Sequence, residues 1–403
     1  MRPFDGRRIL LGVTGGIASY KTVMLARLLT QAGAEVDVVM TRAALEFVGA
    51  ITFEAVTGRR SYSEIFGAGN ALDHIRLANE AALFVVAPAT ADFLARAAHG
   101  HADDLLTAAL LANTSPVLLV PAMNDRMWAN TQTAANVASL RERGYTVLDP
   151  DEGPLAAGEG SGPGRMPEPE TIMSHIARRL EPDSSLSGKR IVVTAGATRE
   201  AVDPVRFISN HSSGRMGIAI AEAAWRRGAS VTLVLGHAEV PVGAGPVVLR
   251  AESVDEMAAA VASTLPTADA LVMAAAPADF RPAKPADRKI SKRDDSAGMA
   301  IRLSPTTDIL RSTLPLRPPH AIIVGFALET GDALAKGEAK LREKSLDMIV
   351  VNDALEEGAG FRVDTNRVTI VTPGAKPERL PLMTKAALAD AILDRVEPLL
   401  SGR

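Results

Sequence analysis

The chain has 403 residues, enough for two or three domains of about 150 residues each. Hydrophobic residues make up 47% and charged residues 23%, as in an ordinary globular protein, and 44 basic against 47 acidic side chains leave a net charge of −3. This balance provides no basic field, so we expect no nucleic-acid partner. The absence of cysteine excludes disulfides, iron–sulfur clusters, thiolate zinc sites and cysteine nucleophiles.

The beginning of the chain lacks the pattern of an export signal. The apolar run Ile9–Val13 is shorter than the apolar core of a signal peptide. No other apolar run approaches the roughly 20 residues of a membrane span. We therefore expect a cytoplasmic protein with no membrane partner.

A strand–turn–helix–strand unit opens the first half of the chain. Thr14-Gly15-Gly16 predicts a turn, apolar residues at helical spacing predict a helix over 17–32, and Gly33 would end it. Short continuous apolar runs predict buried strands at 9–13, 36–40, 83–87 and 117–120. This order of elements is typical of a parallel α/β sheet.

The second half repeats the scheme. A turn at Ala195-Gly196-Ala197-Thr198 follows its first strand, and the stretch 218–227 predicts a helix that Gly228 would end. The predicted strands are 190–194, 231–235, 271–275, 322–326, 348–351 and 368–371. The polar segment 181–188 is typical of a linker. We therefore predict an α/β protein with two doubly wound, mostly parallel-sheet domains, 1–186 and 187–403.

The glycine turn at 12–16 lies where backbone N–H groups and a helix dipole favour a phosphate. It does not match the dinucleotide pattern G-x-G-x-x-G, and the chain has no Walker lysine motif. The segment Met40-Thr41-Arg42 also lacks the acidic residue that would hold an NAD ribose. A mononucleotide such as FMN fits better than NAD. The alternative is a tight turn into a packed helix.

Two further segments of the first half carry candidate polar groups. Asn124 follows a buried strand, at the sheet edge where α/β sites form, and its amide could grip a carboxylate or cap a helix. His74 alternates with apolar neighbours, a setting more typical of a structural histidine. His99 and His101 with Asp103 and Asp104 resemble a metal cluster, but a solvated helix entry is the favoured interpretation.

Polar residues of the second half point to a nucleoside triphosphate. The segment 210–214, Asn-His-Ser-Ser-Gly, precedes a helix and predicts an anion site. Asp279 follows a strand and could help to hold Mg²⁺, and Lys289 lies in the basic run 288–293. Lys340 and Lys344 stand one helical turn apart and could add to the same positive field.

At these residues the chain resembles the bifunctional phosphopantothenoylcysteine synthetase/decarboxylase family of bacterial coenzyme A biosynthesis, over nearly its full length. The segments that carry the resemblance are 15–18, 74–75, 87–91 and 121–128 in the first half, and 194–200, 203–217, 275–280 and 289–292 in the second. The resemblance implies a flavodoxin-like first domain and a Rossmann-like second domain.

For the second domain, the resemblance implies a ligase that uses CTP and Mg²⁺ to activate 4′-phosphopantothenate as an acyl-cytidylate, from which cysteine displaces CMP. Asn210 would hold this intermediate, Lys289 would serve its formation or use, and Asp279 would help to hold the metal. The residues expected to bind CTP are Ala275, Asp279, Lys289, Asp308, Phe326, Lys340 and Lys344.

For the first domain, the resemblance implies an FMN-dependent decarboxylase of 4′-phosphopantothenoylcysteine. His74 would act as a base or stabilise a thiolate, and Asn124 would grip the substrate carboxylate. FMN would contact Gly15, Gly16, Ser19, Thr41, Ala89 and Thr90. The resemblance also implies a homo-oligomer built on trimers of this domain, with FMN between subunits.

The first domain departs from the family in its substrate clamp, which normally reads about Ala-Cys-Gly-Asp/Glu and then Gly-x-Gly-Arg-Met. Here Ala157 stands where the cysteine is expected, followed by Glu159 and, later, Arg165 and Met166. That cysteine would donate a proton in the reductive half of the reaction. Glu159, Ser161 or water would have to replace it, or the reaction would stop at the oxidised enethiol.

Three other functions compete with this interpretation. A flavin prenyltransferase shares the first fold but lacks the 121–128 motif and a second domain. A non-catalytic binding partner would not need His74 and Asn124. A homologue that acts on another cysteinyl acid is the third.

Ala157→Cys should raise the yield of 4′-phosphopantetheine at least tenfold, because alanine has no exchangeable proton and general acid catalysis is worth about 10²–10⁴-fold. The unchanged chain should release CO₂ anaerobically but leave its flavin reduced after one turnover. Mass detection of the product and the flavin absorbance spectrum measure both effects. Full conversion by the unchanged chain would contradict this prediction and direct attention to Glu159.

Overall fold

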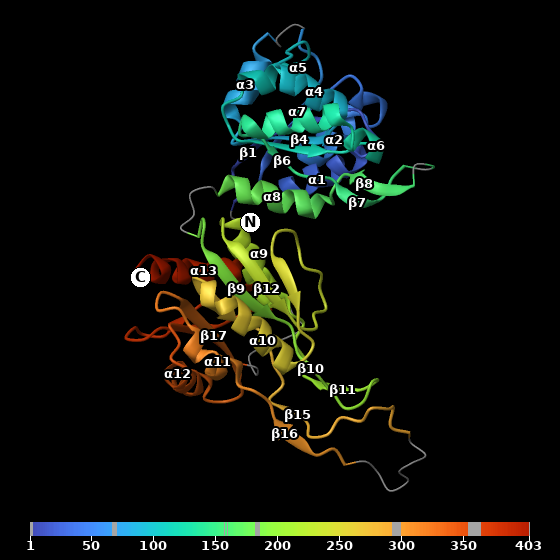
Figure 1. The fold of residues 1–403 in the computed structure, drawn as a ribbon. Coiled ribbons are helices and arrows are strands. Elements are labelled where there is room, and N and C mark those ends of the chain that lie inside the picture. The colour runs from blue at the N-terminus through green and yellow to red at the C-terminus, as the bar shows by residue number, and fades with distance from the viewer. Residues whose placement is uncertain are drawn as a thin grey trace. The chain divides into compact units, whose positions relative to one another are not determined.

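The computed structural model describes residues 3–66, 71–156, 158, 160–181, 186–291, 300–353 and 364–402. The chain divides into two compact units, Met1–Glu181 and Pro182–Arg403 (Figure 1). The division falls inside the polar segment 181–188. None of the helices in the described part has the length and apolar character that a bilayer crossing requires.

The first unit contains a six-stranded parallel sheet in the order β3-β2-β1-β4-β5-β6. Its strands are β1 (Arg8–Val13), β2 (Glu35–Met40), β3 (Ser61–Tyr62), β4 (Leu83–Ala89), β5 (Val117–Pro121) and β6 (Thr146–Val147). Without the two-residue β3 at its edge, this is the flavodoxin-like order. Strand β1 pairs with both β2 and β4, and Gly12 faces Val39 on one side and Val86 on the other.

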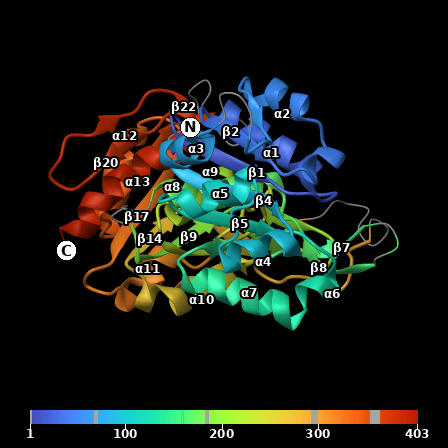
Figure 2. The same ribbon diagram turned by 90° about the horizontal axis from the view of Figure 1, so that it is seen from above.

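Helices cover both faces of this sheet (Figure 1). One core includes buried side chains of α1 (Ser19–Gln31), α2 (Ala50–Thr57) and α8 (Pro169–Leu180). The other core includes those of α3 (Asp73–Glu80), α4 (Ala91–His99), α5 (Leu105–Ala112) and α7 (Thr131–Glu142), and α4 lies against α7 (Figure 2). The doubly wound architecture predicted for this half is confirmed.

The second unit contains an eight-stranded sheet in the order β13-β12-β9-β14-β17-β18-β20-β21. Its first six strands are parallel, and β20 and β21 add antiparallel strands at one edge. The strands are β9 (Arg190–Ala195), β12 (Ser230–Leu235), β13 (Val247–Arg250), β14 (Ala270–Met273), β17 (Ile322–Glu329), β18 (Met348–Asp353), β20 (Thr369–Val371) and β21 (Glu378–Arg379). The parallel part has the Rossmann order, as predicted.

Two cores again flank the sheet. Helices α9 (Arg215–Arg226) and α13 (Lys385–Ser401) contribute to one, and α10 (Val254–Thr264), α11 (Ile309–Ser312) and α12 (Ala333–Glu343) to the other. Two small antiparallel ribbons extend from this unit and lie side by side: β10 (Arg199–Ala201) with β11 (Phe207–Ser209), and β15 (Phe280–Pro282) with β16 (Leu303–Pro305) (Figure 1).

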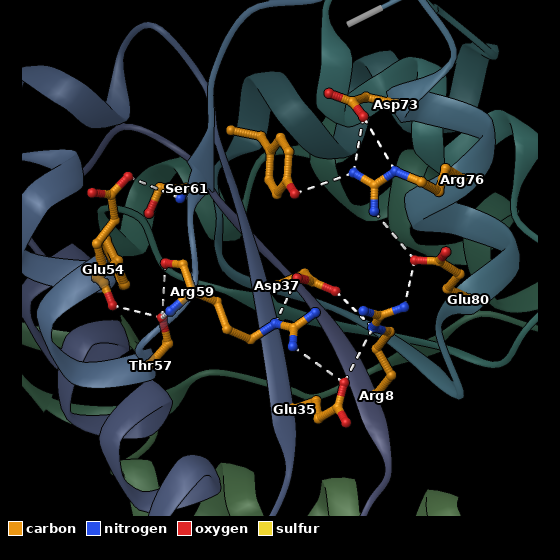
Figure 3. A network of polar contacts seen from close by, with 12 residues as sticks. Arg8, Glu35, Asp37, Glu54, Thr57, Arg59, Ser61, Asp73, Arg76 and Glu80 are labelled. Carbon is orange, nitrogen blue, oxygen red and sulfur yellow. Dashed lines mark hydrogen bonds and ion pairs between the residues drawn. The ribbon is translucent and has the colours of Figure 1, made fainter. Parts of the chain in front are cut away.

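A polar network joins β1, β2 and the loop after α2 in the first unit (Figure 3). Its centre is Asp37, whose side chain is only 4% exposed and lies 3.0 Å from Arg8 and 2.9 Å from Arg59. Glu35, on the same strand, is half exposed and lies 3.2 Å from Arg59. Because two cations lie beside this one buried carboxylate, its negative charge is compensated. A buried charge without partners would have no such compensation.

Asp37→Asn should lower the free energy of unfolding of the first unit by about 3 kcal/mol, because it removes the buried charge that both arginines face. Glu35→Gln, at the exposed rim of the same network, should cost less than about 1 kcal/mol. Urea unfolding can be followed by Trp128 fluorescence in a Trp225→Phe background, which leaves one tryptophan. Equal losses in the two variants would show that burial of Asp37 does not matter.

Candidate functional site

A cavity of about 420 Å³ lies at the carboxyl ends of β1, β4 and β5 in the first unit. Gly15 and Gly16 line it after β1, Thr90 after β4 and Asn124 after β5. The chain leaves β1 toward β2 on one side, whereas β4 is followed by β5 on the other. The diverging connections leave a crevice between the adjacent strands β1 and β4, where α/β proteins bind ligands.

Close backbone contact shapes the floor of this cavity. A Cβ atom on Gly15 would lie 2.5 Å from the Cβ of Ala43, so only glycine lets the turn approach the segment after β2. The Thr14 hydroxyl donates to the carbonyl of Pro88 and accepts the N–H of Thr90, at 2.7 and 3.2 Å. These bonds tie the turns after β1 and β4 together.

The residues expected to hold FMN fall into two groups. Gly15, Gly16 and Thr90 line the cavity. Ser19, Thr41 and Ala89 do not line it. The buried Ser19 hydroxyl donates to the carbonyl of Gly16 at 2.7 Å, so it supports the turn. Thr41 follows β2, and its hydroxyl accepts the N–H of Ala44, while Ala89 is buried at the end of β4.

Asn124 caps a helix, one of the two roles that the sequence left open, and it also lines the cavity. It precedes the short helix α6 (Asp125–Trp128), and its side-chain oxygen accepts the N–H of Arg126 at 2.9 Å, which caps the helix. The same residue lines the cavity. Capping fixes its orientation at the sheet edge, so the two interpretations do not exclude each other.

The clamp segment is a hairpin of β7 (Asp151–Pro154) and β8 (Ser161–Arg165). It closes over the cavity through Gly164, whose carbonyl accepts the N–H of Met123. A Cβ atom on Gly164 would lie 2.2 Å from the carbonyl oxygen of Met123, so this contact requires glycine. Arg165 and Met166, which the sequence assigned to the clamp, line the cavity. Ala157 and Glu159 lie outside the described residues.

His74 does not line this cavity. It is the second residue of α3, and its Nδ1 atom is buried without a hydrogen-bond partner. The segment 99–104, with its two histidines and two aspartates, leads into helix α5. Asp104 caps this helix by accepting the N–H of Thr107, and Arg96 forms an ion pair with Asp104 at 2.8 Å. Within the described ranges, no group of three or more His, Asp or Glu residues could hold a metal ion.

Lys21 is a cavity residue that sequence reasoning missed. Its side chain is almost wholly buried, and its ammonium donates to the carbonyl of Met166 at 2.8 Å and to Glu168 at 3.0 Å. The pair lowers the pKa of Glu168, chiefly through the hydrogen bond from Lys21. In the sequence, Lys21 is indistinguishable from the solvated lysines of any amphipathic helix. Here it attaches the end of the clamp to α1.

The second unit contains a cavity of about 250 Å³ at the corresponding place, beyond the carboxyl ends of β9, β14 and β17. Ser212, Ser213 and Gly214 line it before α9, as the predicted anion site requires. Gly217 allows α9 to approach β9, since a Cβ atom there would lie 2.7 Å from the carbonyl oxygen of Thr194. The start of α9 therefore lies at the cavity, where its helix dipole favours an anion.

Three of the residues expected to bind CTP line this cavity: Ala275, Phe326 and Lys340. Lys340 also pairs with Glu329 at 2.5 Å. Asn210 lies beside them, because its amide donates to the carbonyls of Pro277 and Ala276, at 3.0 and 3.3 Å.

The other four do not line this cavity in the described part of the chain. Asp308 caps α11 and pairs with Lys344 at 3.1 Å. Asp279 and Lys289 are exposed on loops.

Sequence reasoning missed Arg215, Asn352, Asn366 and Lys385, which also line the second cavity. Lys385 is buried at the start of α13, and burial is the main cause that lowers its pKa, with Arg215 adding to the effect. The Asn352 side-chain oxygen is buried without a hydrogen-bond partner. Arg215, Lys340 and Lys385 thus converge on one small cavity from three helices, which suits an anionic ligand.

Fold and cavities together define a two-unit α/β protein with one site on each doubly wound sheet. Residues 186–399 match the family model of the DNA/pantothenate metabolism flavoprotein C-terminal domain, and residues 2–181 match the Flavoprotein model.

Known proteins resemble the chain along almost its whole length. The coenzyme A biosynthesis bifunctional protein CoaBC of Mycobacterium tuberculosis (strain ATCC 25618 / H37Rv) is 45% identical, covering 98% of this chain and 97% of the relative. That of Vibrio vulnificus (strain YJ016) is 42% identical, covering 99% and 100%. The crystal structure of the C-terminal domain of a CoaBC protein is 36% identical, covering 55% of this chain and 100% of that domain, with a TM-score of 0.47.

The chain belongs to the CoaBC family of bifunctional proteins of coenzyme A biosynthesis. It is an enzyme with a decarboxylase and a ligase activity, and the resemblance found in the sequence is confirmed. A flavin prenyltransferase does not fit a chain whose second half matches the C-terminal family domain.

Proposed function

We propose that the chain ligates cysteine to 4′-phosphopantothenate in domain 187–403 and decarboxylates the product to 4′-phosphopantetheine in domain 1–186. The observation that carries this proposal is the pair of cavities, each at the switch point of its own sheet and each lined by residues that sequence reasoning had assigned to one of the two reactions. The product of the ligation is the substrate of the decarboxylation, which gives one chain a reason to hold both sites.

FMN fits the first cavity. The space is ample for a flat ring, Gly15 and Gly16 present backbone at the start of α1, and Pro88 and Met123 offer apolar walls. Bound FMN would supply the oxidation of the cysteine thiol that makes loss of CO₂ possible. Asn124, held by its capping bond, would orient the substrate carboxylate. Arg165 and Met166 would exclude water from the cavity on the side of the hairpin β7–β8.

His74 requires a second copy of the chain to take part. Ile17 and Tyr20 line the first cavity yet are 68% and 55% exposed, and Met24 continues the same apolar stripe of α1. Leu72, two residues before His74, is 70% exposed. Apolar surface of this extent indicates an interface between subunits. We therefore infer that trimers of this domain bury the stripe and bring His74 of one subunit to the cavity of another, as a base or a stabiliser of the thiolate.

CTP and Mg²⁺ fit the second cavity. The N-terminus of α9 and the cations Arg215, Lys340 and Lys385 would neutralise the triphosphate, and the backbone near Ala275 would contact the cytosine. Mg²⁺ would bind phosphate oxygens together with Asp279, in keeping with the few protein ligands this ion usually takes beside a nucleotide. Asn210 would hold the acyl-cytidylate beside the Ala276 and Pro277 carbonyls.

Phe326 would pack against the nucleotide. Asp308 and Lys344 would complete the nucleotide site once the ion pair between them opens.

The proposal is tested by incubating the protein with CTP, Mg²⁺, cysteine and 4′-phosphopantothenate and identifying the products by mass. Formation of 4′-phosphopantothenoylcysteine is the expected result. Ligation of a different acid in preference would support the alternative of a homologue for another cysteinyl compound.

His74→Asn should retain flavin and lose CO₂ release from preformed 4′-phosphopantothenoylcysteine, because the residue does not shape the flavin cavity within one chain but supplies a titratable group to the reaction. Flavin absorbance and CO₂ release are measured on the same sample. The exposed His101→Asn is the matched control and should change neither. Loss of flavin and of activity together would mean that His74 is structural.

Lys385→Met should raise the KM for CTP about tenfold or more, because one charged contact to phosphate is worth about 1.5–3 kcal/mol. Methionine keeps the buried stem, so kcat should change less than threefold. Initial rates of CMP release at varied CTP give both constants. Lys376→Met, on an exposed loop of the same unit, serves as the control. An unchanged KM would remove Lys385 from the nucleotide site.

A further inference from the structure

One carboxylate in the second unit holds two segments that are far apart in the sequence. Asp203 lies in the turn between β10 and β11, and its side chain has no exposed surface. Its Oδ1 accepts the N–H groups of Val205 and Arg206, each at 2.8 Å. Its Oδ2 accepts the Arg206 guanidinium Nε–H at 2.9 Å and the backbone N–H of Ile290 at 3.1 Å.

The two oxygens therefore serve different purposes. Oδ1 closes the local turn, whereas Oδ2 reaches the chain 87 residues later. Arg206 completes the second connection by donating to the carbonyl of Ile290 at 2.8 Å. The N–H of Ala286 donates to the carbonyl of Val202 at 2.9 Å, so the segment 286–290 is held at both ends by the turn.

The charge of Asp203 is stable in this setting. The hydrogen bond from the Arg206 guanidinium is the main cause that lowers the pKa of Asp203, and the N–H groups of Val205, Ile290 and Arg206 lower it further. The carboxyl group of Asp203 thus stays ionised throughout the neutral pH range. Both of its oxygens therefore remain hydrogen-bond acceptors there.

The position of this anchor matters for the ligase reaction. Ile290 is the residue after Lys289, whose side chain is exposed. The turn that contains Asp203 joins the two strands of the ribbon, β10 and β11. Strand β11 ends one residue before Asn210. Asn210 is in turn fixed to the Ala276 and Pro277 carbonyls at the second cavity.

We propose that Asp203 is a positioning residue of the ligase reaction: its Oδ2 fixes the backbone beside Lys289 to the ribbon that carries Asn210. This inference rests on the role that the resemblance implies for Lys289 in forming or using the acyl-cytidylate, and on the function proposed above for Asn210. Asp203 has no contact with the second cavity in the described residues and acts through Lys289.

Asp203→Asn separates the two functions of the carboxylate. The asparagine oxygen can still accept the Val205 and Arg206 N–H groups and close the turn. Its NH₂ group replaces Oδ2 and is a donor, so it cannot accept from Ile290 or from the guanidinium. The turn should persist while the Lys289 segment loses its anchor.

The kinetic test measures ligation by the full-length protein. Asp203→Asn should lower kcat at least tenfold with the KM for CTP within threefold, because the residues that line the second cavity keep their places. Tryptic cleavage after Arg288 and Lys289, followed by mass analysis of early peptides, should accelerate at least fivefold. Asp269→Asn is the matched control: its carboxylate also accepts a backbone N–H, from Arg190, but at the opposite edge of the sheet. It should leave both readouts unchanged.

A double variant distinguishes positioning from a general loss of structure. In a Lys289→Gln background, Asp203→Asn should lower kcat by less than a further twofold, since the group it positions is gone. A full additional loss would overturn the inference, as would normal kcat in Asp203→Asn when Lys289→Gln lowers kcat more than tenfold. Normal ligation by Lys289→Gln would overturn it by a different route, because the proposed function of Lys289 would then be wrong.

Discussion

The reversal of strand order beside β1 and β9 is the constraint on which both sites depend. In each unit the chain leaves the first strand toward one side of the sheet and later fills the other side, so the loops after two adjacent strands diverge. The crevice between these two loops therefore follows from the strand order and does not depend on particular side chains. Because the strands around it are buried and parallel, the backbone that lines each crevice is held in place by the two cores on either side.

Glycines bring helix starts close to both crevices, an arrangement that favours anions. Gly15 lets the first turn contact the Ala43 segment, and Gly217 lets α9 contact the Thr194 carbonyl, at separations that a methyl group would forbid. A helix start brought this close to a strand end directs the positive end of the helix dipole toward the crevice. Both units thus direct the positive end of a helix dipole toward the crevice, although the sequences around the two turns differ. Neither turn therefore needs to match a dinucleotide pattern.

The central strands of both sheets could be predicted from the sequence, because short buried strands appear as apolar runs and glycines mark the turns after them. The strands β3, β6, β13 and β21 were not predicted, because they are short or exposed and form no long continuous apolar run. The turn residues Gly15 and Gly16, which line the first cavity, were singled out by the same glycine pattern. Arg215 and Lys385 could not be, since a basic residue in the first turn of a helix usually faces solvent. Only packing of α9 against α13 turns them toward one cavity. The roles of His74, Asp279 and Lys289 remain predictions, because none of them lines a cavity within the described part of one chain.

Two of the cations that line the second cavity, Arg215 and Lys340, are already paired, as is Lys344 one helical turn after Lys340, and this affects how an anion can enter. Arg215 pairs with Asp364 at 2.7 Å, Lys340 with Glu329, and Lys344 with Asp308. Asp364 is 81% exposed, and exposed pairs contribute at most about 1 kcal/mol, so exchange of a carboxylate for a phosphate costs little. A hydrogen bond from a cation to phosphate contributes about 1.5–3 kcal/mol. In the proposed nucleotide site, the displaced Asp364 would stay at the exposed edge, where its charge would oppose a bare triphosphate but attract a divalent cation that accompanies it. This carboxylate would thereby favour a nucleotide bound together with its metal ion over the nucleotide alone.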